Sequence, residues 1–153
     1  MFDRFTDRAR KVLGLSKQAA DEFGHPEIRP EHILLGLVRE GAGLGTAALE
    51  KMSVCTAELE RSLMADMPGE EGVASSPQLP FTPESKDVLR QALNEAGAAK
   101  LDFIGTEHLL LGVLHVEASP ASQLLRTRGV EADALRQTIR TLLEGTDDAL
   151  PDV

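Results

Sequence analysis

The chain is an internal duplication, and no other feature restricts its fold as strongly. The segment FTDRARKVL, which begins at Phe5, matches FTPESKDVL, which begins at Phe81, 76 positions later. PEHILLGLV matches TEHLLLGVL at the same offset, and the register continues without a gap to Leu59 and Leu135. A unit of roughly sixty residues buries little surface when it folds alone. We therefore expect the two copies to pack together about an approximate two-fold axis.

The duplication divides the chain into four segments. We assign residues 1–67 to the first repeat, 68–80 to a linker, 81–145 to the second repeat and 146–153 to an acidic tail. The linker, PGEEGVASSPQLP, is rich in Gly, Pro, Ser and acidic residues and has no helical periodicity. Because each repeat needs the surface of the other, the sequence predicts one pseudo-symmetric domain.

Each repeat begins with a pattern that is typical of a helix. In the first repeat, small or apolar residues recur at spacings of three and four from Phe5 to Phe23, and they include Ala9, Val12, Leu13, Ser16 and Ala20. Thr6 and Thr82 stand where an N-cap residue belongs. Gly24 follows the apolar stripe, where a left-handed residue commonly ends a helix.

The second helix of each repeat is expected to lie at the centre of the fold. EHILLGLVRE, the segment of the first repeat, is apolar on nearly every side except at its ends, as in a helix that is enclosed by neighbours. Gly36 and Gly112 fall inside these helices, where Gly costs about 1 kcal/mol relative to Ala. We expect another helix to approach closely at both glycines.

The remainder of each repeat predicts two shorter helices. The glycines in residues 41–45 are expected to break the chain before a third helix around 47–52, and apolar positions up to Met67 indicate a fourth. In the second repeat, Pro120 opens the third helix and Gly129 closes it. No alternating apolar run predicts a strand. The fold class is therefore all-α, with eight helices as two tandem four-helix units.

Charge and composition exclude several classes of function. The formal net charge is -9 and the pI is about 4.9, so the surface repels a phosphate backbone. Trp and Tyr are absent, which removes the stacking platform of single-strand binders. The chain starts with charged residues and has no apolar stretch of membrane length. We expect a cytoplasmic monomer that binds neither nucleic acid nor membrane, and the single Cys55 fits a reducing compartment.

The residues that carry chemistry form no recognisable catalytic or metal site. No phosphate-binding loop of the G-x-x-x-x-G-K-[ST] type occurs, which excludes a self-contained ATPase. The four histidines, at positions 25, 32, 108 and 115, lack the spacing and the Cys partners of a zinc site. No serine lies in a G-x-S-x-G turn. We expect no enzyme activity, no catalytic residues, no metal and no cofactor.

One polar pair recurs at the start of the most apolar helix of each repeat: Glu31 with His32, and Glu107 with His108. On a structural interpretation, the glutamates favour the helix dipole and the histidines hydrogen-bond to the backbone of neighbouring loops. On a functional interpretation, the helix N-terminus attracts an anion and the carboxylate attracts a guanidinium, which suits a ligand that carries both charges. The residues alone leave both interpretations open.

Several motifs, in order and twice, resemble the N-terminal double-repeat domain of the Clp ATPases, especially of the ClpC type. They are MFDRFTDRARKVL, EHILLGL with EHLLLGV, and PFTPESKDVL, and the resemblance covers Met1 to about Gly145. It implies eight helices in two Clp repeats about a pseudo-two-fold axis. It also implies a non-catalytic domain of the Clp chaperone–protease system that binds adaptors, substrates or phosphoarginine-tagged proteins.

The resemblance also implies candidate site residues. ClpC-type domains bind phosphoarginine with the glutamate of a G-T-E-H motif, which corresponds to Glu31 and Glu107. The second copy is intact as Gly105, Thr106, Glu107 and His108, whereas the first reads Arg29, Pro30, Glu31 and His32. Pro30 has neither a backbone N–H nor a hydroxyl. We expect binding at Glu107 alone, while Arg29 either pairs with Glu31 or offers the anion a substitute cation.

ClpC-type domains are also targets of cyclic-peptide antibiotics, and the resemblance places that surface at Met1, Phe2 and Phe81. Phe2 and Phe81 equally suit a role in the core. Two further alternatives stay open at this point: an N-terminal domain cut from a full Clp ATPase, and a freestanding paralog. The paralog would act as a regulator or decoy, which includes sequestration of Clp-targeting antibiotics. An unfamiliar helical enzyme would have to use the Glu–His pairs.

Overall fold

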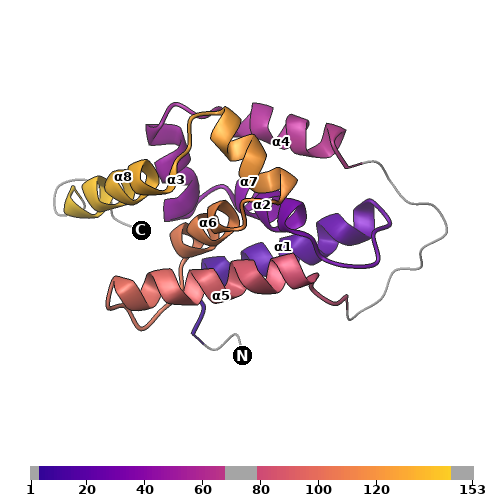
Figure 1. Ribbon diagram of the computed structural model, residues 1–153, viewed down its shortest axis with the longest axis horizontal. Coiled ribbons are helices and arrows are strands. Elements are labelled where there is room, and N and C mark those ends of the chain that lie inside the picture. The colour runs from indigo at the N-terminus through magenta and orange to yellow at the C-terminus, as the bar shows by residue number, and fades with distance from the viewer. Residues whose placement is uncertain (1–3, 68–78, 146–153) are drawn as a thin grey trace.

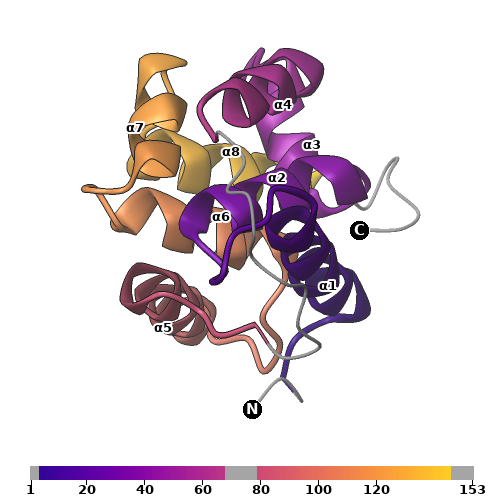
Figure 2. The ribbon, with the colours of Figure 1, turned by 90° about the vertical axis from the view of Figure 1, so that its right-hand side faces the viewer.

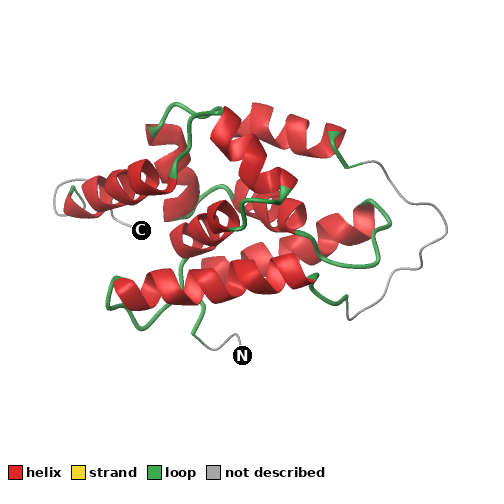
Figure 3. Ribbon diagram, viewed as in Figure 1, coloured by secondary structure: helices red, strands yellow, loops and turns green. Residues whose placement is uncertain are grey.

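The computed structural model describes residues 4–67 and 79–145. Within these ranges the chain is all-α, with helices and loops and no named strand (Figure 3). The helices are α1 (Asp7–Glu22), α2 (Pro30–Glu40), α3 (Leu44–Lys51), α4 (Thr56–Ala65), α5 (Pro83–Ala98), α6 (Thr106–His115), α7 (Pro120–Thr127) and α8 (Ala132–Glu144). The prediction of eight helices is confirmed. Of the predicted linker, Leu79 and Pro80 alone are described, and the predicted tail, Met1 and Phe2 lie outside the described residues.

The two apolar helices α2 and α6 lie at the centre, as predicted. α1 packs against α2, α5 packs against α6, and α2 and α6 also contact each other. Figure 1 shows α1 and α5 along one side of the molecule, with α4 and α7 on the opposite side. Turned by 90°, Figure 2 shows α2 and α6 between these layers. The central helices supply fully buried side chains, among them Ile33, Leu34, Leu35, Leu109, Leu110 and Leu114.

The ends of the first helix of each repeat follow the predicted signals. The Thr6 hydroxyl accepts a hydrogen bond from the backbone N–H of Ala9 at 3.1 Å, and the Thr82 hydroxyl accepts one from Ser85 at 3.1 Å. Each bond satisfies a backbone donor that has no partner inside the helix. Gly24 has φ of 68° and ends the first helix in the left-handed conformation.

The two repeats exchange backbone hydrogen bonds in a reciprocal manner. The N–H of Thr6 donates to the carbonyl of Ile104 at 2.9 Å, and the N–H of Thr82 donates to the carbonyl of Ile28 at 3.0 Å. These residues are equivalent, because each pair of positions differs by 76: 6 and 82, 28 and 104. This exchange is what a pseudo-two-fold axis between the copies requires. As a result, the start of α1 borders the loop that precedes α6.

The third helix begins earlier than the sequence predicted. Gly41 has φ of 70° and ends α2, as expected, but Gly43 is the extended N-cap of α3, with φ of -84°. Gly45 lies in the first turn of α3, so the prediction that it breaks the chain was wrong. A Cβ on Gly45 would lie 3.0 Å from the carbonyl oxygen of Thr106. The glycine is therefore explained by the close approach of α3 and α6.

Candidate functional site

The first turns of α2 and α6 hold both Glu–His pairs, and the histidines have structural roles. His32 Nδ1 accepts a hydrogen bond from the backbone N–H of Arg29 at 2.8 Å, and His108 Nδ1 accepts one from Gly105 at 2.9 Å. Both rings are buried. Burial lowers the pKa of His108, and it lowers that of His32 to about 3, so both rings are neutral near pH 7. The structural interpretation of the histidines is confirmed.

Gly105 makes room for the carboxylate of Glu107. A Cβ at position 105 would collide with Glu107 Oε1, so this side chain lies over the backbone of the N-cap residue. The first repeat has Arg29 at the equivalent position, and its Cβ would occupy that space. The glutamates of the two repeats therefore lie in different environments. Glu107 is half-buried, whereas Glu31 is 8% exposed.

Thr106 joins the two repeats. Its hydroxyl is buried and accepts a hydrogen bond from the backbone N–H of Gly45 at 3.0 Å. This bond satisfies one of the first amides of α3, which have no partner inside their helix. A Cβ on Gly43 would collide with the same hydroxyl. The threonine of the motif therefore positions the start of α6 against the start of α3.

In the first repeat, Glu31 makes the contact that Thr106 makes in the second, because Pro30 has no hydroxyl. The N–H groups of Glu31 and of Ala121, which is equivalent to Gly45, hydrogen-bond to the Glu31 carboxylate and favour its charged form. Burial has the larger effect, and it raises the pKa of Glu31 above its usual value. Glu31 Oε1 has no hydrogen-bond partner among the described residues. Glu31 is thus turned toward the inter-repeat contact.

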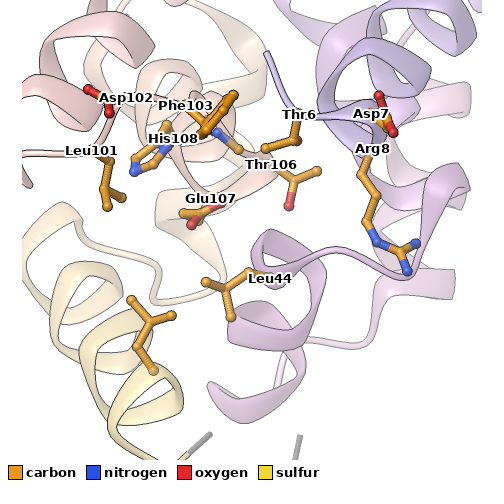
Figure 4. A pocket seen from close by; sticks show the side chains of 12 residues that line it. Thr6, Asp7, Arg8, Leu44, Leu101, Asp102, Phe103, Thr106, Glu107 and His108 are labelled. Atoms are coloured by element: carbon orange, nitrogen blue, oxygen red, sulfur yellow. Dashed lines mark hydrogen bonds between the residues drawn. The ribbon is translucent and has the colours of Figure 1, made fainter. Parts of the chain in front are cut away.

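Glu107 borders a cavity of about 460 Å³ at the start of α6 (Figure 4). Thr6, the N-cap of α1, and Arg8 of α1 line one side, and Leu44 of α3 lies on another. The loop before α6 and the end of α8 contribute three apolar side chains that are unusually exposed. These are Phe103 at 61%, Leu101 at 44% and Leu143 at 43%.

A second cavity of about 520 Å³ continues from the first between the end of α5 and α8. Both cavities share Leu101, Glu107, His108 and Leu143. We call the two together the α6 groove. Ala99 at the end of α5 and Ile139 on α8 add apolar surface. The groove is therefore largely apolar and contains a carboxylate at its middle.

Most charges around the α6 groove are neutralised by neighbours. Arg8 pairs with Glu40 at 3.1 Å, and Glu95 pairs with Arg136 at 2.7 Å. The hydrogen bonds from Arg136 lower the pKa of Glu95 to about 2. Glu107 forms no ion pair with any described residue. A cationic group of a ligand can therefore reach a carboxylate that has no competing cation bound to it.

The structure separates the predicted site residues into two cavities. Gly105, Thr106 and Glu107 lie at the α6 groove, whereas Arg29 and Glu31 border a cavity of about 460 Å³ beside Ser119 and Pro120. The apolar residues of the α6 groove were missed. A comparison of the repeats contains one signal, because the apolar Leu101 stands opposite the polar His25. Leu143 stands opposite Met67, which is also apolar, and gives no such signal.

The predicted antibiotic surface stays a prediction. Phe81 is half-buried, packs against the core and pairs with Ile28, which fits a role in the core. Met1 and Phe2 lie outside the described residues. Across residues 4–67 and 79–145, no group of three or more potential ligands could hold a metal ion, and no helix is long and apolar enough to cross a membrane.

Taken together, the helices and the groove define an all-α, internally duplicated domain with a partly apolar groove at one helix N-terminus. Two overlapping stretches, residues 4–128 and 80–149, match the Clp repeat (R) N-terminal domain. The chain belongs to this family, as the motifs had indicated.

The similar proteins agree with this assignment. Over 143 residues the chain is 36% identical to ClpC/MecB, the negative regulator of genetic competence of Bacillus subtilis, and the match covers 94% of this chain and 17% of that protein. The N-domain of ClpV from Vibrio cholerae is similar with a TM-score of 0.76 and 14% identity, over 94% of this chain and 87% of that one. A complex of the ClpV N-domain with a VipB peptide is similar with a TM-score of 0.74 and 14% identity, over 94% and 89% of the two chains. The two ClpV structures support the fold alone.

Proposed function

We propose that this chain is a non-catalytic recognition domain that binds segments of other proteins in the α6 groove, as adaptors or substrates of a Clp chaperone–protease. The observation that carries this proposal is the half-buried carboxylate of Glu107, without an ion pair among the described residues, between exposed apolar side chains. Exposed apolar surface next to an uncompensated charge is typical of a binding site. The ClpV N-domain, which has the same fold, forms a complex with a VipB peptide.

Phosphoarginine-tagged proteins are the ligand class that the groove suits best. The guanidinium of phosphoarginine pairs with the Glu107 carboxylate, and its phosphoryl group lies near the first turn of α6, where the helix dipole favours an anion. The Glu31 cavity suits this ligand less, because the Glu31 carboxylate is buried and turned toward the amide of Ala121, and because Pro30 has no backbone N–H to offer the phosphoryl group.

Calorimetric titration of free phosphoarginine tests the proposal. Glu107→Gln keeps the shape of the side chain and removes its charge, and Glu31→Gln is the matched control at the equivalent position. A charge-assisted hydrogen bond contributes about 1.5–3 kcal/mol, so Glu107→Gln is expected to weaken binding by about tenfold or more. Glu31→Gln is expected to leave the affinity unchanged. Equal losses in both variants, or no binding to the unmodified protein, would contradict the proposal.

A further inference from the structure

The end of α5 reproduces the backbone of the end of α1 but carries a much smaller side chain. Phe23 and Ala99 are the C-cap residues, with φ, ψ of -91°, 2° and -83°, 0°. The next residues, Gly24 and Lys100, are both left-handed, with φ of 68° and 60°. The Cα–Cβ bonds of Phe23 and Ala99 therefore have equivalent directions within their repeats. One position carries a phenyl ring and the other a methyl group.

In the first repeat the chain uses this phenyl ring to cover its own interior. The Phe23 ring stacks on the His25 ring, with 6.0 Å between the ring centroids and 22° between the planes, and it packs against the core. His25 is 2% exposed, and its Nδ1 lies 2.8 Å from His32 Nε2. Met67 at the end of the repeat is 3% exposed. Aromatic and sulfur-containing side chains thus seal this end of the first repeat.

In the second repeat, the described side chains leave the equivalent positions exposed. Leu101, equivalent to His25, is 44% exposed, and Leu143, equivalent to Met67, is 43% exposed. Ala99, Leu101 and Leu143 all line the larger cavity of the α6 groove, which has a volume of about 520 Å³. In comparison with Phe23, Ala99 lacks the phenyl ring. The groove is therefore open at the place where the first repeat holds its own aromatic ring.

Glu107 favours a positively charged ligand group at the same place. It lines both cavities of the α6 groove and forms no ion pair with any described residue. Figure 4 shows the Glu107 side chain directed into the space between Leu101 and Leu44. A ligand that brings an aromatic ring to Ala99 therefore places its neighbouring group near a carboxylate, and charge complementarity favours a cation there.

We propose that the α6 groove takes a peptide segment in which an aromatic residue stands next to Arg or Lys. The aromatic ring lies against Ala99, Leu101 and Leu143, in the position that the Phe23 ring has in the first repeat, and the basic side chain pairs with Glu107. This inference rests on the proposed recognition function and specifies the residues that select the ligand. Aromatic anchors in apolar pockets are typical of residues that dominate the energy of a binding interface.

The chain itself makes the test simple, because it contains no Trp and no Tyr. Indole fluorescence then comes from the ligand alone. The probe is N-acetyl-Ala-Trp-Arg-Ala-amide, with N-acetyl-Ala-Trp-Glu-Ala-amide as the charge control. We expect a saturable blue shift of the Trp emission with the first peptide and about tenfold weaker binding of the second. Equal binding of the two peptides, or no binding of the first, would overturn the inference.

Ala99→Phe is the decisive variant, because it gives the second repeat the side chain that the first repeat already accommodates. It is expected to weaken binding of the Trp-Arg peptide by about tenfold or more while the helical circular dichroism is unchanged. Leu101→Ala removes an exposed wall residue and is expected to weaken binding without affecting folding, so it tests the site even where Ala99→Phe does not fold. If both variants fold and bind the peptide with full affinity, the aromatic ring does not lie at this position and the inference is refuted.

Two outcomes separate this inference from the proposed function. In the first outcome, phosphoarginine binding depends on Glu107, but peptide binding is unchanged by substitutions at Ala99 and Leu101. This outcome supports the proposed function and refutes the aromatic site. Absence of phosphoarginine binding, combined with Ala99-dependent peptide binding, refutes the phosphoarginine assignment and supports the aromatic site. Sedimentation velocity tests a second copy of the chain as the occupant: a dimer that Ala99→Phe dissociates would overturn the inference.

Discussion

Gly36→Ala in α2 is expected to destabilise the protein, although alanine is the better helix former. A Cβ at this position would lie 2.6 Å from the carbonyl oxygen of Val12 and 2.7 Å from the hydroxyl of Ser16, both on α1. The carbonyl belongs to the backbone, and the buried Ser16 hydroxyl donates a hydrogen bond to it at 2.7 Å. Neither atom moves without loss of packing or of that hydrogen bond.

The change in the free energy of unfolding follows from two opposing effects. Overpacking of this kind costs about 1–3 kcal/mol, and the upper part of the range applies because the contacts are with backbone and with a fixed hydroxyl. Alanine recovers about 1 kcal/mol of helix propensity. The net loss is therefore about 2 kcal/mol, which lowers the Tm of a domain of this size by about 4–8 °C.

Gly14→Ala in α1 is the matched control. No heavy atom lies within 4 Å of a Cβ at this position, and the residue is exposed. The propensity gain then acts alone and raises the stability by about 1 kcal/mol. Urea unfolding followed by circular dichroism measures both variants. Shifts of the same sign in Gly14→Ala and Gly36→Ala would refute the packing argument.

Three further predictions concern pH and the contacts between helices. The pKa of His32 falls from 6.5 to about 3 on folding, so the folded state binds this proton less readily than the unfolded state. The contribution of His32 to the free energy of unfolding is therefore present above pH 6.5 and is lost as the pH falls toward 3. The free energy of unfolding from urea titrations should therefore decrease between pH 7 and pH 4, by at most about 3 kcal/mol from this group. Thr106→Val removes the acceptor of the Gly45 N–H and should cost about 1–3 kcal/mol in the free energy of unfolding, whereas Thr106→Ser should restore most of it. Glu95→Gln breaks the pair with Arg136 between α5 and α8 and should lower the Tm at pH 7 more than at pH 2, where the carboxylate is already becoming protonated.

The sequence was sufficient to predict the architecture because the fold depends on periodicity that is visible twice. Apolar spacing, the caps at Thr6 and Thr82, and Gly36 inside an apolar helix are local signals, and each has a direct structural counterpart. The early start of α3 was missed because Gly45 serves a contact with α6 rather than a chain break. That contact is between residues far apart in the sequence, so local signals do not reveal it.

The site was predicted in part. The motif predicted that Glu107 and Glu31 are not equivalent, and Pro30 gave a reason. The sequence did not indicate that Glu31 turns inward to the amide of Ala121, because that position depends on how α7 meets α2. The apolar part of the α6 groove was missed for a similar reason. The local sequence pattern does not distinguish Leu101 and Leu143 from core residues, although both are exposed at the larger cavity.

The central claim is that recognition takes place in the α6 groove at Glu107 and not at the equivalent Glu31. Two-dimensional amide NMR of the uniformly labelled protein, titrated with phosphoarginine and then with the Trp-Arg peptide, tests this claim most directly. The account predicts shift changes in residues 99–108 and 139–143 and in the groove residues Arg8 and Leu44, with residues 23–32 unaffected. Matching changes around Glu31, or changes around Glu31 alone, would contradict it.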